Sequence, residues 1–209
     1  MTSTLRRLYQ GQSLLRIHMN EGFRRHAVRG FVVDVGGGRN PDYFEYFRDG
    51  GVSRREAVDQ SLSPIDFERD ALPFEDGVAD TVVCANMLEH IYRYAFLLGE
   101  MRRILRPGGT LVGFVPFLIQ YHPDPHDYSR YTKEALERML LDAGFREPAI
   151  ERVGGGPFSA NFNNLVLSVP RVLRPLLYPG YALLDWVFLL LRPGAAERYP
   201  LGFIFTSKK

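Results

Sequence analysis

The apolar residues of this chain gather in short runs, and most of these runs end at a glycine or an acidic residue. Runs of this length that end in turn residues are typical of buried parallel strands. We therefore predict strands at about residues 31–35, 55–59, 65–70, 79–86 and 109–116, and a final strand within 201–209.

Helical spacing of apolar residues occupies much of the chain between these strands. We predict helices at about 5–28, 94–105 and 132–145, the last capped by Thr132 and ended by Gly144, and an apolar helical region over 165–191. The glycine-rich stretch 154–164 is predicted as an exposed loop. Strands that alternate with helices predict an α/β fold with a doubly wound, mostly parallel sheet.

The composition is that of one globular domain. The chain has 209 residues and a net charge of only +2, which argues against the broad basic surface of nonspecific nucleic-acid binding. We therefore expect no nucleic-acid partner. The single cysteine, Cys84, excludes an internal disulfide and suits a cytoplasmic location. The longest apolar stretch, 181–191, contains Asp185 and is too short to span a bilayer.

Arginines crowd the N-terminal segment, with little acid nearby: Arg6, Arg7, Arg16, Arg24, Arg25 and Arg29. Two interpretations are open. The arginines lie on a solvated helix face, or they contact an anionic substrate or a membrane surface.

Glycines and acidic residues stand where the predicted strands end. Gly36 to Gly38 follow the first strand, where glycine lets the backbone come close to an anionic ligand. Asp59 ends the second strand, and a carboxylate there can accept both hydroxyls of a ribose. Asp70 ends the third. In an open α/β sheet these residues meet in the crevice at the carboxyl edge, so we predict a ligand site there.

Five segments in this order resemble the class I S-adenosylmethionine-dependent methyltransferases: "VVDVGGGRNP", "AVD", "ERDALPF", "DTVVCANMLEHI" and "LRPGGTL". The resemblance covers residues 31–145 and is nearest to small single-domain enzymes that methylate small molecules, lipids or sugars. It implies one methyltransferase domain over 1–209, with an N-terminal helical segment (1–29), a cofactor-binding core (30–150) and a C-terminal apolar region with the last strand (151–209). It also implies a Rossmann-like sheet with helices on both faces and an antiparallel C-terminal strand.

The resemblance assigns S-adenosylmethionine as cofactor and gives roles to matching positions. Asp34 orients the glycine loop and the methionine amino group, Asp59 binds the ribose hydroxyls, and Asp70 with the backbone of Ala71 binds the adenine. Asn86 lies under the methionine and the sulfonium. The expected cofactor-binding set is Asp34, Gly36, Gly37, Gly38, Asp59, Gln60, Asp70, Ala71 and Asn86. Asn40 stands where the family often has a further glycine, and Asn also tolerates left-handed backbone.

The segment "NMLEHI" has two interpretations. Some related quinone-pathway O-methyltransferases show E-x-x-E-H here and use it with a divalent metal, but this chain has Asn86 in place of the first Glu. Glu89 and His90 alone make a poor site for a hard metal ion, so we predict no metal. We instead favour the second interpretation, in which Glu89 and His90 begin the next helix and bond to neighbouring loops.

The stretch "QYHPDPHDYSRYT", 120–132, follows the fifth predicted strand and so reaches the same edge of the sheet. Its prolines prevent the helix that would align His122 with His126 on a zinc ion. Two interpretations remain. His126 is the candidate base, with Asp127 and Tyr128 beside it; or Asp127, Arg130 and Tyr131 pin the loop and Thr132 caps the helix. The segment is similar to one that shapes the acceptor pocket in this methyltransferase group.

We therefore expect methyl transfer to an oxygen or nitrogen of a small-molecule, sugar or lipid-linked acceptor. One rival is a nicotinamide-dependent oxidoreductase, whose G-x-G-x-x-G pattern is incomplete in "GGGRNP". Another is a non-catalytic cofactor-binding or partner subunit of the same fold. The apolar region 165–191 could form an acceptor pocket, a homodimer face, a membrane-touching surface or ordinary core.

Overall fold

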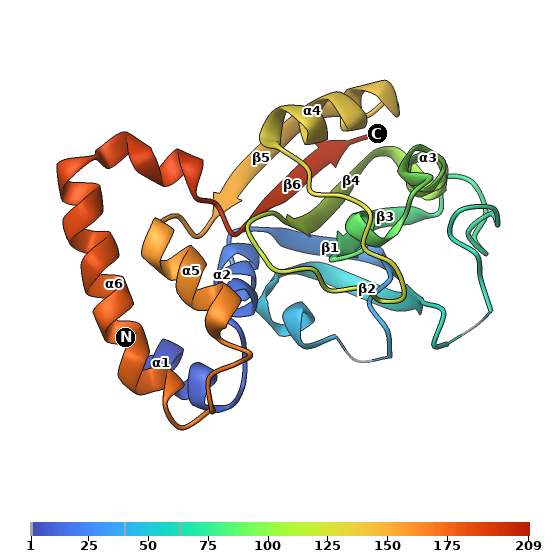
Figure 1. The fold of residues 1–209 in the computed structure, drawn as a ribbon. Coiled ribbons are helices and arrows are strands. Elements are labelled where there is room, and N and C mark those ends of the chain that lie inside the picture. The colour runs from blue at the N-terminus through green and yellow to red at the C-terminus, as the bar shows by residue number, and fades with distance from the viewer. Residues whose placement is uncertain (1, 40, 63) are drawn as a thin grey trace.

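The computed structural model describes residues 2–39, 41–62 and 64–209. Within them a six-stranded sheet has the order β2-β1-β3-β4-β6-β5 (Figure 1). The strands are β1 (Ala27–Val35), β2 (Arg48–Val58), β3 (Ala79–Ala85), β4 (Leu105–Pro116), β5 (Arg146–Val153) and β6 (Gly202–Lys208). The first four are mutually parallel, and β6 is antiparallel to β4 and β5. The predicted α/β class and antiparallel last strand are therefore confirmed.

Helices cover both faces of the sheet (Figure 1). The α-helices are α1 (Thr2–Tyr9), α2 (Leu14–Phe23), α3 (Tyr94–Ile104), α4 (Lys133–Asp142), α5 (Pro157–Leu165) and α6 (Arg174–Leu191). Short 3-10 helices are η1 (Asp42–Tyr46), η2 (Leu88–His90) and η3 (Pro193–Arg198).

The core forms separate clusters on the two faces of the sheet, because the side chains of the central strands alternate between those faces. Val33 of β1 packs in the cluster that holds α3 and α4, whereas its neighbour Val32 packs in the cluster that holds α2 and η1. Both side chains have no exposed surface. Because successive residues of a strand point to opposite faces, strands covered on both sides are apolar throughout, which is why these runs were readable in the sequence.

The helix predicted over 5–28 is wrong in part. Gly11 has a φ of +98°, a conformation that a helix does not contain, and the chain turns there between α1 and α2. The Ser13 side chain then accepts a hydrogen bond from the backbone N–H of Arg16 and begins α2. Val28 belongs to β1, which starts at Ala27, earlier than predicted.

The strand predicted over 65–70 is wrong, because these residues form turns. The Asp66 side chain accepts from the Glu68 backbone N–H at 2.9 Å, and the Asp70 side chain accepts from the Asp66 backbone N–H at 2.8 Å. Local bonds of this kind compete with a strand ladder. Phe67 alone is buried, so the apolar residues anchor a loop.

The loop predicted over 154–164 is also wrong from Pro157 onward, where α5 begins. Asp185 of α6 accepts the backbone N–H groups of Phe158 (2.9 Å) and Ser159 (2.7 Å), so the first turn of α5 is capped by a residue distant in sequence. The helical region predicted over 165–191 is helical only from Arg174, where α6 starts, because residues 166–173 after α5 form mainly turns.

The remaining helices agree with their patterns. The predicted helix over 94–105 is α3, and Thr132 caps α4 by accepting from the backbone N–H of Ala135 at 3.2 Å. Gly144 follows α4 with a φ of +83°. Asn40 and the prediction attached to it lie outside the described residues. None of the helices in the described parts of the chain combines the length and the hydropathy needed to cross a membrane.

Candidate active site

Two adjoining hollows lie along the carboxyl edge of the parallel strands. The large hollow has a volume of about 830 Å³ and the small hollow about 610 Å³. Gly36, Asn86, His90 and Asp124 line both. The two hollows therefore meet just beyond the ends of β1 and β3, where open α/β sheets bind ligands.

The glycine turn after β1 packs tightly on one side and is open on the other. A Cβ at Gly36 would stand 2.6 Å from the sulfur of Met87, and Gly36 has a φ of +81°. A Cβ at Gly37 would overlap the Asp34 carboxylate and approach the Tyr43 hydroxyl at 2.6 Å. At Gly38, with a φ of +63°, a Cβ would meet nothing within 4 Å. The turn thus holds Asp34 in place and leaves backbone facing free space.

Asp34 is fully buried at the end of β1. Its two carboxylate oxygens accept the Tyr43 hydroxyl at 2.8 and 3.0 Å. Burial raises the pKa of Asp34 to about 7, although the hydrogen bond from Tyr43 lowers it. A cationic group placed beside this carboxylate would favour its charged form.

The small hollow begins at the end of β2. It contains Asp59 and Gln60 as the sequence predicted, together with Ser61, Asp66 and Phe67. Asp59 Oδ1 accepts the Ser61 backbone N–H at 2.8 Å, which orients the carboxylate without using its second oxygen. Asp66 and Phe67 were missed because residues 65–70 were assigned to a strand.

Asp70 and Ala71 lie away from this group. Both are exposed, and Asp70 lines a shallower surface hollow that it shares with Gln60. Their neighbour Leu72 is buried, and its backbone N–H donates to Glu100 at 2.8 Å. The structure therefore places Asp70 and Ala71 outside the small hollow, with Asp70 in a neighbouring surface hollow.

Asn86 directly follows β3 and has a left-handed conformation, with a φ of +51°. Its side-chain nitrogen lies 3.4 Å from the Met19 sulfur of α2, and its backbone N–H donates to Phe114 at 2.9 Å. Asn tolerates this backbone region better than most residues. The side chain stands at the border between the two hollows.

The segment 120–132 is tied to η2 and to α4. The Glu89 carbonyl accepts the Tyr128 backbone N–H at 2.8 Å, and the Leu88 carbonyl accepts the Tyr131 hydroxyl at 3.0 Å. Asp127 and Arg130 form an ion pair, and its hydrogen bonds hold the pKa of Asp127 down to about 2. Asp127 Oδ2 also accepts the His122 backbone N–H at 2.9 Å. The contacts of the loop-pinning interpretation are therefore present.

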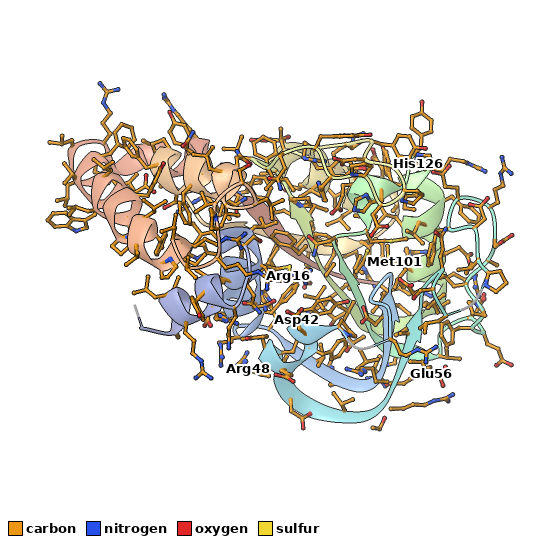
Figure 2. The ribbon with its side chains drawn as sticks, turned by 60° about the horizontal axis from the view of Figure 1, so that its bottom comes forward. Arg16, Asp42, Arg48, Glu56, Met101 and His126 are labelled. Atoms are coloured by element: carbon orange, nitrogen blue, oxygen red, sulfur yellow. The ribbon has the colours of Figure 1, made fainter. Side chains whose placement is uncertain are left out.

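His126 and Tyr128 lie on the small-hollow side of this loop. Their rings pack at a centroid distance of 5.2 Å, and Tyr128 makes an edge contact with Tyr92. His126 stands well apart from Arg16 and Asp42 in Figure 2. His122 instead lines the large hollow, so the two histidines of this stretch face different spaces.

The large hollow draws its walls from distant parts of the chain. Residues 10–13 between α1 and α2 contribute, as do Arg16, Asp42 and Asn163. Arg16 Nη1 lies 3.2 Å from Asp42 Oδ1, and the two residues are labelled close together in Figure 2. Of these, only Arg16 was singled out as a candidate for anionic contact; the rest gave no local signal, because they become neighbours only through the packing of α2, η1 and α5.

Residues 41–113 match the family described as "Methyltransferase domain". A relative from Mycobacterium tuberculosis, named a probable S-adenosylmethionine-dependent methyltransferase, is 30% identical over 92 residues, which cover 41% of this chain and 34% of the relative. Residues 41–113 therefore resemble this methyltransferase family in sequence.

Solved structures agree on the fold of the methyltransferase domain. One is the 1,6-didemethyltoxoflavin-N1-methyltransferase of Burkholderia thailandensis, with a TM-score of 0.53, 17% identity, and coverage of 98% of this chain and 81% of that chain. Another belongs to the complex of the Haloferax volcanii Trm112 methyltransferase activator with a methyltransferase, with a TM-score of 0.56, 18% identity, and coverage of 92% and 90%. The chain spans about a third of the length of the first curated relatives it matches.

Proposed function

We propose that this methyltransferase domain moves the methyl group of S-adenosylmethionine to an oxygen or nitrogen of a small acceptor. The observation that carries the proposal is the meeting of two hollows at Gly36, Asn86 and His90. The donor occupies the small hollow and the glycine turn, and the acceptor occupies the large hollow. A lone pair of the acceptor forms the bond to the methyl carbon as the carbon–sulfur bond breaks, and S-adenosylhomocysteine leaves.

Donor binding rests on the groups at the strand ends. Asp59 receives the ribose hydroxyls with Gln60 beside it, and Asp34 holds the methionine ammonium through the turn at Gly36, Gly37 and Gly38. Asn86 lies near the sulfonium. Asp70 with the backbone of Ala71 binds the adenine. Neither residue lines the small hollow, so this pair is the part of the proposal that a bound structure tests most directly.

Acceptor chemistry needs alignment more than a strong catalyst, because the sulfonium is already a good leaving group. The reacting atoms have to approach to about 3–3.5 Å in line. His126 remains the proposed base, with Asp127 and Tyr128 as its neighbours. Its placement by the small hollow makes His126→Ala informative: a collapse of turnover with unchanged cofactor affinity supports the base, and unchanged turnover assigns the residue to the loop scaffold.

Binding measurements test the proposed function first. Calorimetry should show that S-adenosylhomocysteine binds and NAD does not, and the opposite result would overturn the methyltransferase proposal in favour of the oxidoreductase. Turnover is then measured as S-adenosylhomocysteine released with panels of phenols, amines, sugars and lipid-linked acceptors. Cofactor binding with no turnover on any panel member would favour the non-catalytic subunit.

Helix α6 supplies the proposed contact with lipid. Its charged residues, Arg174 and Asp185, are both buried and bond inward, to Val169 and to the start of α5. The outward side is apolar and lies at the edge of the molecule in Figure 1. Its exposed residues include Leu176, Leu183, Leu184, Trp186, Leu190 and Leu191.

Arginines flank this face at Arg171 and Arg192, which suits an anionic lipid surface. The chain should therefore sediment with phosphatidylglycerol vesicles but not with phosphatidylcholine vesicles, and Trp186→Ser with Leu183→Ser should abolish this. A concentration-dependent dimer without vesicle binding would instead assign the face to a second copy. A cytoplasmic location stays a prediction that rests on the lone cysteine.

A further inference from the structure

Glu89 is a buried carboxylate with no hydrogen-bond partner for its side chain. It is fully buried, and within the described residues neither of its carboxylate oxygens has a hydrogen-bond partner. An ionised carboxylate without compensation is strongly unfavourable in a protein interior. Something therefore has to compensate Glu89, and the groups around it indicate what.

Two imidazoles face this carboxylate from different elements. His90 Nε2, from η2, lies 3.7 Å from Glu89 Oε1, and His122 Nε2, from the loop after β4, lies 3.9 Å from the same oxygen. One potential ligand atom from each of the three residues lies within 4.8 Å of the other two. The two distances from Glu89 Oε1, 3.7 and 3.9 Å, are too long for hydrogen bonds. They are only slightly longer than the roughly 3.3 Å between neighbouring ligand atoms of a tetrahedral zinc ion.

We propose that Glu89, His90 and His122 bind a divalent transition-metal ion of the zinc type. Two imidazoles and one carboxylate are a ligand set of zinc, ferrous and cobaltous ions, whereas magnesium and calcium prefer oxygen ligands throughout. The sequence prediction of no metal counted only the two residues within "NMLEHI". It lacked His122, which the fold brings in from another loop.

Both histidines have partners that orient their outer nitrogens. His90 Nδ1 lies against the carbonyl oxygen of His126, so this nitrogen carries the proton and leaves the lone pair on Nε2. His122 Nδ1 lies 3.3 Å from the Gln120 carbonyl oxygen and 3.4 Å from Asp127 Oδ2, which both accept a proton from it when Nε2 carries the lone pair. Arg130 Nη2, 3.1 Å from the same Nδ1, is paired with Asp127. Imidazoles that bind metals usually have such outer partners. Asp127 is therefore a positioning residue for His122.

The open side of the proposed site faces the large hollow. The exposed fraction of the side chain rises from 0% at Glu89 to 10% at His90 and 32% at His122. His90 and His122 both line that hollow. On the proposed function, the free coordination positions would therefore receive an oxygen or nitrogen of the acceptor and fix it near the donor; metal binding itself does not depend on that function.

The test is a titration of the chelator-treated chain with ZnCl₂, followed by calorimetry, and with CoCl₂, followed by visible absorption. We expect one equivalent of either ion, no comparable binding of MgCl₂, and a cobalt spectrum without the thiolate charge-transfer band that Cys84 would give. Glu89→Gln and His122→Ala should each weaken zinc binding at least about 100-fold, whereas Asp127→Asn should weaken it about 10- to 100-fold.

The matched control is His126→Ala, which removes an imidazole from the same loop but keeps the backbone carbonyl that His90 contacts. Its zinc affinity should equal that of the parent chain. Absence of stoichiometric zinc binding, or affinity that is unchanged in both Glu89→Gln and His122→Ala, overturns the proposal and leaves Glu89 as the counter-ion of a protonated His122. Circular dichroism and S-adenosylhomocysteine affinity of the same metal-free samples report folding and the proposed function separately.

Discussion

The two hollows differ in how their walls are assembled. The small hollow is lined largely by short segments that directly follow strands, at Gly36, Asp59 and Asn86. The turn that holds Phe67 and the loop after β4, with His126 and Tyr128, complete it. The large hollow is lined by the α1–α2 connection, η1, the loop after β4 and the end of α5. The proposed donor space is thus built mainly from the strand ends, while the proposed acceptor space is built mainly from the segments that pack around the sheet. Substitutions in the small hollow should therefore change the affinity for the donor, whereas substitutions in the large hollow should change KM for the acceptor.

The largest expected effect concerns the buried Asp34. Burial raises the pKa of Asp34 to about 7, from 3.8 in the unfolded chain. The folded chain then holds a proton that the unfolded chain releases, so this contribution to the free energy of unfolding is complete below about pH 4 and is lost as the pH rises to about 7. It amounts to roughly 4 kcal/mol at most. Denaturant unfolding of Asp34→Asn should lack this pH dependence between pH 5 and 8.

The Asp34 carboxylate also gives a test of donor binding through its pH dependence. If Asp34 holds the ammonium of S-adenosylhomocysteine, affinity should fall by up to about tenfold per pH unit below pH 7, because binding then requires loss of a proton. Calorimetry in buffers of different ionisation enthalpy should show that proton release. Binding with no released proton and no pH dependence would contradict the contact.

The next effect is at the ribose. Asp59→Ala should weaken S-adenosylhomocysteine binding by about 1.5–3 kcal/mol, roughly 10- to 150-fold, because hydrogen bonds to a charged group are lost. Asp49, exposed on β2 away from both hollows, offers the control Asp49→Ala, which should bind like the parent chain. Wild-type affinity in Asp59→Ala, measured by calorimetry, would refute the assigned ribose contact.

Gly37→Ala tests whether the close packing of the glycine turn against Asp34 and Tyr43 contributes to the stability of the fold. Its Cβ would displace Asp34 and Tyr43, so we expect a loss of about 1–3 kcal/mol in the free energy of unfolding. Gly99 of α3 is a matched control, since a Cβ there would meet nothing within 4 Å. Gly99→Ala should be neutral or stabilise by up to about 1 kcal/mol. Equal stability of both variants in urea would show that the turn relaxes freely.

The smallest expected effect concerns the ion pair between Arg16 and Asp42 in the large hollow. Arg16 and Asp42 form a half-exposed ion pair at 3.2 Å, and such pairs contribute less than about 1 kcal/mol. Arg16→Ala should leave the urea midpoint and the S-adenosylhomocysteine affinity nearly unchanged while raising KM for an anionic acceptor. A large loss of cofactor affinity in this variant would break the division between the two hollows.

Much of the lining of the small hollow could be predicted, because the sequence patterns that mark it lie within short segments. An apolar run followed by glycines or an acid marks a buried strand and its loop, and the parallel sheet brings those loops together whatever the helices do. The misses have equally local causes. Residues 65–70 have the apolar spacing of a strand, but their Asp side chains bond to nearby backbone, and α5 was missed because Asp185, which caps it, lies far along the chain.

The sequence by itself determined the α/β class, the ends of β1 to β4 to within one residue, and the family that those strand ends resemble, because each depends on patterns within a short segment. Only the tertiary structure decided which side chains share a space. It separated His122 from His126, set Glu89 between His90 and His122, and paired Arg16 with Asp42. These neighbours come from segments joined only by packing, and no periodicity within a segment specifies which other segment will lie across from it.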